Sequence, residues 1–347
     1  MRDGPSAAVM LTPMSGTVVL HVGLMKSGTT FVQAQLFAQQ ASLGEAGVLV
    51  PGASWGDQAR GVARALKAAP ALEKAEDWQA LAGPAREHDG VSVISMEFLG
   101  PAEPRKIKAI VASLRPARVE TVITVRDLNR TLVAQWQETV QNGRWWTFAD
   151  YLAGVEAARP DGGSPQDEAG RTFWRQQDLV RIARTWQAAT DRCTVVIVPP
   201  PGAPREELWH RFCGVAGLPI GDPVRTGGAN ASLGAASTLA LRALNEVLAE
   251  RGMVFPQRSQ VRKPLLAKRI LAARRPEESA IGLPVLPWVV EASQALVAGT
   301  RALGVEIVGD LDELTPVAVP GVDPAEVPLA EIRAAAIAGT AGLVEAR

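Results

Sequence analysis

The sequence predicts an α/β protein with a doubly wound, mainly parallel sheet of about five strands flanked by helices. Short runs of β-branched residues recur along the chain, and most are almost continuously apolar, as expected for parallel strands covered on both faces. Helical patterns lie between these runs, and strands that alternate with helices are typical of this fold class. The expected strands are residues 17–23, 47–50, 91–95, 120–125 and 194–199.

Helical patterns fill the intervals between and after the strands. Residues 29–44, TTFVQAQLFAQQASLG, predict a helix that ends at Gly44. The polar, glycine-rich segment 159–171 predicts an exposed loop or lid. Later helices are expected at 235–251 and 288–303, with a basic helix between them at 262–275.

The composition is that of a globular protein without a dominant charge. The 347 residues include 47% hydrophobic and 21% charged residues, and the formal net charge is +0. We therefore expect no nucleic-acid partner, because no global field attracts the protein to polyanions. The two cysteines, Cys193 and Cys213, and three histidines show neither a disulfide framework nor the spacing of metal ligands. No metal site is expected.

The chain ends and the most apolar stretch bear on location and domain organisation. The start, MRDGPSAAVMLTPMSG, has no basic region followed by a continuous apolar stretch, so we expect no signal peptide. The stretch IGLPVLPWVVEASQALVAG contains Pro284, Pro287 and Glu291, so no membrane span is expected. These features predict a cytoplasmic protein with a flexible segment 1–16, an α/β domain 17–315 and a tail 316–347 that ends in an Ala-rich helix.

The stretch LMKSGTT, residues 24–30, predicts an anion-binding loop between the first strand and the first helix. Gly28 can adopt backbone angles that a side chain forbids. The N–H groups of Gly28, Thr29 and Thr30 would then point out of the helix N-terminus, where anions bind. A nucleoside-triphosphatase loop, G-x-x-x-x-G-K-[ST], would place a lysine directly after the second glycine. Here the lysine is Lys26, before the glycine, which favours a shorter anion transferred without a metal.

This loop resembles the 5′-phosphosulfate-binding loop of the sulfotransferases, usually P-K-[ST]-G-T-T followed by an aromatic residue. The matching residues are Lys26, Ser27, Gly28, Thr29 and Thr30. Met25 replaces the usual proline. The resemblance implies a P-loop NTPase-like sulfotransferase fold and 3′-phosphoadenosine-5′-phosphosulfate as the co-substrate, bound by these five residues.

A second anion site is predicted after the strand 120–125. In sulfotransferases the 3′-phosphate is bound by an arginine that follows a strand and by a serine eight positions later. Arg126 fits this pattern, but the later position is Ala134, which removes a hydroxyl donor. Thr131, in the first turn of the helix, is the nearest candidate to replace it. A salt bridge at the strand end is the alternative role for Arg126.

The resemblance extends over most of the chain. The runs WQETVQNGR, GGANASLGAASTLALRALN and VGDLDEL resemble landmarks of a bacterial sulfotransferase-like group, so the similarity covers residues 17 to 315. In sulfotransferases a late loop often closes over the nucleotide, which implies Arg225, Asn230 and Ser232 as candidates, with Ser232 assigned to the donor site. The run N-x-S-L-G is also a helix-capping signal.

Sulfuryl transfer needs a cation for the leaving phosphate and a base for the acceptor proton. Lys26 suits the first task. Glu97 follows the strand 91–95, as does a catalytic glutamate in several Golgi-type sulfotransferases, so it is the leading base. The alternatives are Glu138 and His21, the latter because cytosolic members use a histidine. His21 lies within the first strand, which favours a strand-end histidine that hydrogen-bonds its neighbours.

The sequence therefore predicts a metal-independent sulfotransferase that acts on a hydroxyl or amine of a small-molecule, glycan or lipid acceptor. The alternatives are a P-loop nucleotide kinase or triphosphatase, and a non-catalytic nucleotide-binding relative, which Ala134 favours. Two further features allow either a binding or a structural role. An acceptor pocket could be lined by Trp136, Trp145, Trp146 and Trp174, or these residues could pack in the core. The basic stretch RKPLLAKRILAARR could recruit an acidic acceptor or form a solvated face.

Overall fold

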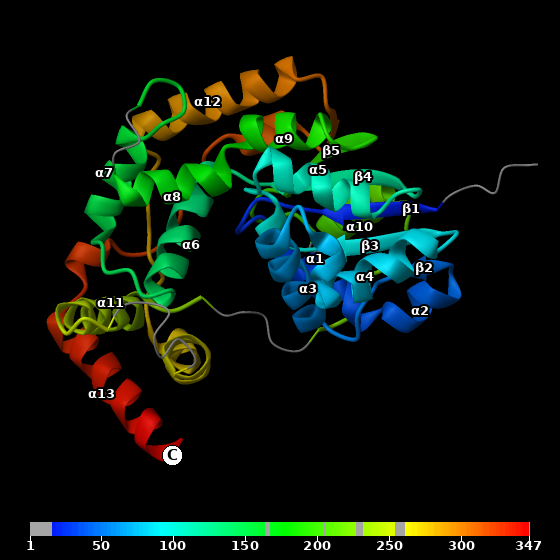
Figure 1. The fold of residues 1–347 in the computed structure, drawn as a ribbon. Helices are drawn as coiled ribbons and strands as arrows, with labels where there is room; N and C mark the ends of the chain where they lie inside the picture. Colours follow the sequence, from blue (N-terminus) through cyan, green and yellow to red (C-terminus); the bar gives the residue numbers. More distant parts are fainter. Residues whose placement is uncertain (1–15, 164–166, 205, 227–231, 254–260, 347) are drawn as a thin grey trace, which may run out of the picture.

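The computed structural model describes residues 16–163, 167–204, 206–226, 232–253 and 261–346. Residues 1–15 of the expected flexible segment 1–16 lie outside these residues, and so does Asn230. At the centre is one six-stranded parallel sheet in the order β2-β3-β1-β4-β5-β6 (Figure 1). The strands are β1 Thr17–His21, β2 Val48–Leu49, β3 Val91–Ser95, β4 Arg118–Val125, β5 Arg192–Ile197 and β6 Glu306–Val308.

Both faces of the sheet are covered, as the apolar strands predict. In β1, Val18 and Leu20 belong to one hydrophobic cluster, whereas Val19 belongs to the cluster on the opposite face. The first cluster is covered by α3 Trp55–Ala68, α4 Glu76–Glu87, α5 Pro104–Ser113 and α9 Leu179–Gln187. The second is covered by α1 Thr29–Ala38, α2 Gln40–Glu45 and α10 Glu207–Ala216. The protein is thus a doubly wound α/β fold.

A second hydrophobic core, made mainly of helices, lies beside the sheet (Figure 1). We call it the helical core. Its helices are α6 Leu128–Gln141, α7 Phe148–Ala157, α8 Glu168–Gln177, α11 Ala235–Glu250 and α12 Pro287–Ala302. The π-helix η3 Val261–Ile270 and the 3₁₀-helix η4 Leu271–Glu277 also contribute to it. Because α6 directly follows β4, the helical core begins at the carboxyl end of a central strand.

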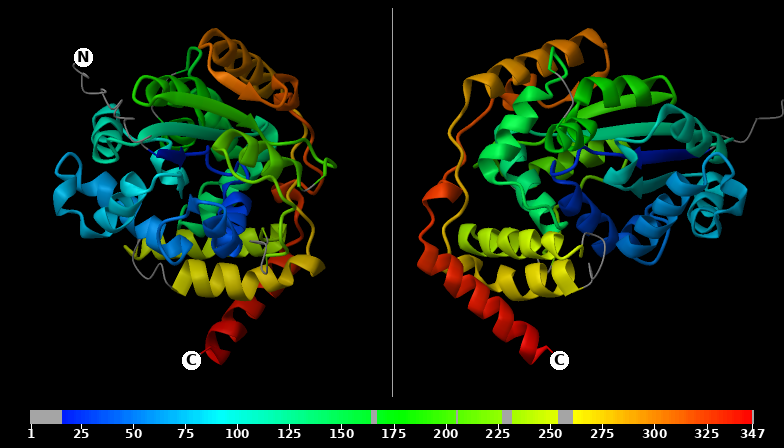
Figure 2. Two further views of the ribbon diagram at one scale, coloured as in Figure 1. Left: turned by 90° about the vertical axis from the view of Figure 1, so that its right-hand side faces the viewer. Right: turned by 60° about the vertical axis from the view of Figure 1, so that its left-hand side comes forward.

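The C-terminal residues pack on the helical core rather than on the sheet. The chain after residue 315 passes through the 3₁₀-helix η6 Pro324–Glu326 to α13 Leu329–Glu345, which contacts α11 and η3 (Figure 2). Gly339 and Gly342 lie on the contact side of α13: a Cβ on Gly339 would lie 3.1 Å from Leu266, and one on Gly342 would lie 2.6 Å from Ile270. These small residues let α13 approach η3 closely.

Asn129, at the start of α6, ties distant segments to the helical core. Its side-chain nitrogen donates hydrogen bonds to the carbonyl oxygens of Leu283, Pro284 and Val317 at 3.0–3.3 Å. Since a buried backbone carbonyl without a donor is costly, one amide here serves three of them. The start of α6, and with it the site described below, is therefore fixed by contacts from two later parts of the chain.

The elements differ from the sequence expectations in four places. A sixth strand, β6, pairs with β5; its three residues are partly exposed and have no long apolar run to reveal them. The first helix is interrupted at Gln39, so α1 and α2 are separate. The expected loop 159–171 already contains the start of α8, and the expected basic helix is π-helical and then 3₁₀-helical. The structure also contains three short 3₁₀-helices, η1 Leu72–Lys74, η2 Glu97–Leu99 and η5 Leu311–Leu314.

The described helices were compared with the length and hydropathy of a membrane span. None of those in the described residues combines the length and apolar character required to cross a lipid bilayer.

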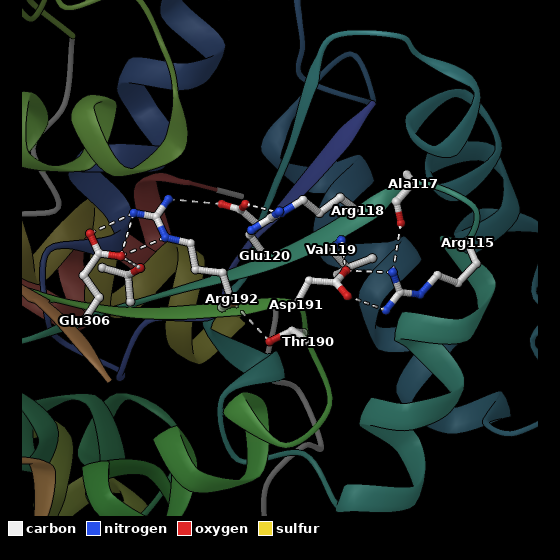
Figure 3. Close-up of polar contacts among 10 residues, drawn as sticks. Arg115, Ala117, Arg118, Val119, Glu120, Thr190, Asp191, Arg192 and Glu306 are labelled. Carbon is white, nitrogen blue, oxygen red and sulfur yellow. Dashed lines mark hydrogen bonds and ion pairs between the residues drawn. The ribbon is translucent and has the colours of Figure 1, made fainter. Parts of the chain in front are cut away.

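Ion pairs and hydrogen bonds join the amino-terminal ends of the strands, opposite the candidate site (Figure 3). Arg192 on β5 bonds Glu306 on the edge strand through two nitrogens at 2.8 Å. Next to it, Asp191 accepts hydrogen bonds from two guanidinium nitrogens of Arg115, at 2.7 and 3.1 Å, and from the Val119 N–H at 2.8 Å. The Arg115 hydrogen bond holds the pKa of Asp191 below its usual range, with partial burial opposing and the Val119 N–H assisting.

Asp191→Asn should lower the free energy of unfolding at pH 7 by roughly 1–2 kcal/mol, because a partly exposed charge-assisted hydrogen-bond network is lost. Since the folded pKa is depressed, the stabilisation is present above the unfolded pKa and disappears as the pH falls through the folded pKa. Urea unfolding at pH 7 and pH 3 should therefore show a smaller difference at pH 3. Asp89→Asn, at an exposed position, is the control and should change stability by less than about 0.5 kcal/mol.

Candidate functional site

Three predicted site residues follow three adjacent strands at their carboxyl ends. Lys26 follows β1, Glu97 follows β3 and Arg126 follows β4. The chain passes from β1 to the outer strands on one side and then returns to β4 on the other, so β1 marks the reversal of strand order. Ligands of open α/β sheets bind in the crevice at this point.

The β1–α1 loop, residues 22–28, is held on the sheet by hydrogen bonds that continue the ladder. The N–H of Val22 donates to Val122 O, and the N–H of Leu24 donates to Thr124 O, both at 2.9 Å. The buried Ser27 hydroxyl donates to Leu24 O and hydrogen-bonds Thr124 Oγ1 at 2.9 Å. The hydroxyl of Ser27 therefore stabilises the loop from within, which leaves its backbone N–H as the group that could contact an anion.

Two residues of this loop have left-handed backbone conformations. The φ of Lys26 is 66°, and that of Gly28 is 80°. For a lysine this conformation costs roughly 1–2 kcal/mol, so the surrounding contacts must hold it in place. A Cβ on Gly28 would also lie 2.5 Å from Leu208 Cδ2. A glycine is required at 28 both by its backbone angle and by the close approach of α10.

The N-terminus of α1 opens towards the same crevice without a side-chain cap. The N–H groups of Phe31 and Val32 both donate to Gly28 O, which leaves the preceding amides of the helix without an intrahelical acceptor. Thr29 is buried and Thr30 is exposed. The structure thus brings the predicted backbone donors together next to Lys26.

Lys26 belongs to an ionic cluster that the sequence did not reveal. Its Nζ donates to Glu138 Oε2 on α6 at 2.7 Å. Lys263 Nζ, from η3, donates to the other oxygen, Oε1, at 2.5 Å and to Asn142 Oδ1 at 2.7 Å. We call these four residues the lysine–glutamate cluster. Lys263 was visible in the sequence only as part of a basic stretch.

The two lysines keep Glu138 ionised. Burial on its own would raise the pKa of Glu138, but the charges of Lys26 and Lys263, and their hydrogen bonds, lower it to about 2. The exposed fractions of the three side chains are 31% for Lys26, 14% for Glu138 and 27% for Lys263. The cluster is therefore partly shielded from bulk water.

Glu97 is positioned by α1. Its Oε2 accepts a hydrogen bond from Gln33 Nε2 at 2.8 Å, and the same amide donates to Ser95 O at 3.2 Å. Gln33 is buried, so it fixes the direction of a carboxylate that is itself partly exposed. Gln33 was absent from the sequence-based site.

The carboxylate of Glu97 and the lysine–glutamate cluster share one electrostatic environment. Partial burial lowers the pKa of Lys268, on η3, and nearby charges modify it further. The ammonium groups of Lys263 and Lys26 lower the pKa of Lys268 further. The carboxylates of Glu138 and Glu97 raise it. All four groups thus lie close enough to Lys268 to influence its charge.

Arg126 lies mostly buried against the first turn of α6. Its Nη2 donates to Arg130 O at 2.9 Å and its Nε to Thr131 Oγ1 at 3.4 Å. Burial and the charge of the neighbouring Arg130 lower its pKa to about 10, although Asp127 opposes both. Asp127 pairs with Arg130, and in the described residues no carboxylate forms an ion pair with Arg126. The salt bridge considered for Arg126 is therefore absent from that part of the chain.

Position 134 lacks its expected donor, and Thr131 does not provide one. The Thr131 hydroxyl donates to Asp127 O at 2.9 Å, so its proton is already engaged. Ala134 and Glu138 are four residues apart on α6 and are both partly exposed. The helix thus places an ionised carboxylate one turn beyond the missing serine.

Gln177 connects the surroundings of Arg126 with the β1–α1 loop. Its amide donates to Met25 O at 2.8 Å. Together with Leu24 and Ser293 it also lines a cavity of about 10 Å³ beside Arg126, enough for one water molecule. The two predicted anion sites are therefore neighbours joined by a buried amide.

His21 is a neutral strand-end histidine. Its Nδ1 lies 2.7 Å from Ser95 Oγ and its Nε2 lies 3.1 Å from Thr124 Oγ1. Burial lowers its pKa to about 3. With both nitrogens engaged and no exposed edge, His21 is unsuited to accept an acceptor's proton.

The candidates in the late loop do not join the cluster. The backbone of Val224 exchanges two hydrogen bonds with the Gln35 side chain, so residues 220–226 lie across α1. Arg225 and Ser232 are exposed, and neither contacts the β1–α1 loop among the described interactions. Asn230 lies outside the described residues.

The tryptophans considered for an acceptor pocket serve mainly in packing. Trp136 and Trp174 are buried in the helical core, and their Nε1 atoms donate to backbone carbonyls of Trp146 and Val155. Trp145 is exposed, and Arg144 lies over the ring of Trp146. Trp174 also lines a cavity of about 290 Å³ with Asp178 and Arg181, but the other three rings are not among its lining residues.

Comparisons of the chain with protein families, curated proteins and solved structures gave no match. The crevice combines uncapped helix amides, two close ammonium groups and a partly exposed carboxylate held by an amide. In the described residues no three histidine, cysteine, aspartate or glutamate side chains are grouped to hold a metal ion.

Gly28→Ala should lower the free energy of unfolding by roughly 1–3 kcal/mol, because the alanine would have a left-handed backbone and press on Leu208. Gly214→Ala is the matched control: this exposed glycine in α10 has open space around its Cβ position. It should raise stability by about 0.5–1 kcal/mol. Urea denaturation would measure both, and equal effects of the two variants would contradict the loop geometry.

Proposed function

We propose that this protein is a cytoplasmic sulfotransferase that moves a sulfuryl group from 3′-phosphoadenosine-5′-phosphosulfate to a hydroxyl or amine. One observation carries the proposal: Lys26, held in a left-handed loop beside the uncapped start of α1, and the oriented carboxylate of Glu97 follow two neighbouring parallel strands at the same edge of the sheet. This arrangement offers a cation, backbone donors and a base at the switch point of the sheet. The resemblance of LMKSGTT to a phosphosulfate-binding loop supports the same donor.

The transfer requires one bond to form and one to break. The acceptor oxygen or nitrogen attacks sulfur, and the bond from sulfur to the bridging phosphate oxygen breaks. The leaving 3′,5′-bisphosphate gains the negative charge, which the ammonium of Lys26 and the amides at the start of α1 stabilise. The acceptor's proton passes to Glu97. Positioning and charge stabilisation dominate, as in phosphoryl transfer.

Glu97 is a better base than the two alternatives. Glu138 is bound by two lysines that lower its pKa to about 2, so it accepts a proton poorly. His21 is buried between two hydroxyl groups. Glu97 accepts a hydrogen bond from a neutral amide, which orients the carboxylate.

Arg126 is assigned to the 3′-phosphate of the donor. Its guanidinium contacts neutral oxygens and is mostly buried, so a bound phosphate would supply the missing counter-charge. Ala134 leaves that phosphate with fewer hydroxyl donors than the family pattern implies. The acceptor, a small molecule, glycan or lipid, is the remaining component of the reaction.

Lys26→Gly should strongly reduce transfer while leaving the protein folded. Glycine accepts the left-handed backbone of position 26, so stability should stay within about 1 kcal/mol of the wild type. The loss of the ammonium should lower transfer from labelled donor, over a panel of hydroxyl and amine acceptors, by about 100-fold or more. Lys26→Arg keeps the charge and is the matched control.

Full activity of Lys26→Gly would overturn this mechanism. Metal-dependent turnover of ATP by the wild type would instead favour a nucleotide kinase or triphosphatase. Calorimetric binding of 3′-phosphoadenosine-5′-phosphate without transfer to any acceptor would favour a non-catalytic nucleotide-binding protein.

Glu97→Gln should separate chemistry from donor binding. The glutamine retains the size and the hydrogen-bonding capacity towards Gln33 but cannot accept a proton at neutral pH. We expect kcat to fall by about 10²–10⁴-fold, while the affinity for 3′-phosphoadenosine-5′-phosphate stays unchanged. A parallel Glu138→Gln variant that lost kcat to the same extent, with Glu97→Gln active, would reassign the base.

A further inference from the structure

The carboxylate of Glu138 bridges two lysines that come from different elements of the fold. One oxygen accepts from Lys26 in the β1–α1 loop and the other from Lys263 in η3. The residues are 112 and 125 positions away from Glu138 in the sequence. Two ammonium groups on one carboxylate leave the three-residue set with a net positive charge. An excess of positive charge in a shielded site favours an added anion.

The position of Lys263 is determined by packing on both sides of η3. On the crevice side its Nζ also donates to Asn142 Oδ1, at the C-terminal end of α6. On the other side η3 packs against α13, where Gly339 and Gly342 permit close contact. Both sides of η3 are thus held by contacts. A lysine on a freely solvated helix face has no such constraint.

Glu138 occupies a position suited to an external oxyanion. A phosphate or sulfate group, like a carboxylate, presents two neighbouring oxygens and can accept from both ammonium groups at once. Lys26 lies next to the uncapped amides of α1, so an anion there would gain those donors as well. Glu138, fixed to α6, is bonded by the lysines but receives no hydrogen bond from these amides among the described contacts.

We infer that Lys263 is a second lysine of the donor site, and that it and Lys26 bind the phosphosulfate oxygens in place of the Glu138 carboxylate. This inference rests on the proposed function. Glu138 then holds the two lysines together while the site is free, and it competes with the donor for them. The basic stretch at 262–275 therefore serves the donor rather than an acidic acceptor.

Calorimetric titration with 3′-phosphoadenosine-5′-phosphate tests both parts of the inference. Lys263→Met keeps the aliphatic stem but removes the charge, and should weaken binding by about 10- to 100-fold. Arg269→Ala, at an exposed position of the same segment, removes the same charge and should bind within about twofold of the wild type. Glu138→Gln removes the competing charge and should bind about tenfold more tightly. Circular dichroism and thermal unfolding would establish that each variant is folded.

The outcomes separate this inference from the proposed function. If the wild type and Lys263→Met bind the nucleotide equally, Lys263 is not a donor ligand, although the enzyme assignment stands. If Lys263→Met changes only the KM of an anionic acceptor, the basic segment serves the acceptor and the inference is wrong. Weaker binding by Glu138→Gln would disprove the competition. If the wild type binds no nucleotide, the proposed function is wrong, and the inference that rests on it is wrong as well. Should Lys263→Met be unfolded, Lys263→Gln provides the same comparison.

Discussion

The parallel direction of all six strands is the constraint on which the site depends. Because every strand ends at the same edge, loops that are far apart in sequence meet there, and the reversal of strand order at β1 opens a crevice between them. This edge carries Lys26, Glu97 and Arg126. The sheet brings them near one another, so no direct contact between their side chains is needed. Their position follows from backbone hydrogen bonds, which side-chain substitutions at the edge leave intact.

The lysine–glutamate cluster adds a connection that the sheet alone does not provide. It joins the β1–α1 loop to α6 and η3, so the sheet and the helical core meet at a charged contact rather than at an apolar one alone. A partly buried carboxylate is costly to maintain unless it is paired, and two lysines meet that requirement here. The same contact helps to hold Lys26 in its left-handed conformation.

Much of the fold and part of the site could be predicted from the sequence. The five longer apolar runs became strands because they are buried on both faces, and the loop glycine identified the start of α1. β6 was missed because three partly exposed residues show no pattern. Lys263 and Gln33 were missed for different reasons: the first reaches the site only through the packing of η3 on α13, and the second is a buried glutamine in a helix whose partner lies 64 residues away.

At the proposed anion site, an internal carboxylate would also affect which anions can bind. Glu138 is tethered to the same molecule, so its effective concentration near the lysines is high, of the order that short linkers give. A lone phosphate or sulfate ion must compete with it using contacts at one place only. A nucleotide that also reaches Arg126 gains a second contact that Glu138 does not oppose, and the two contacts act together. The pairing of Glu138 with the lysines thus favours ligands with two separated anionic groups over simple ions, which is the charge distribution of the proposed donor.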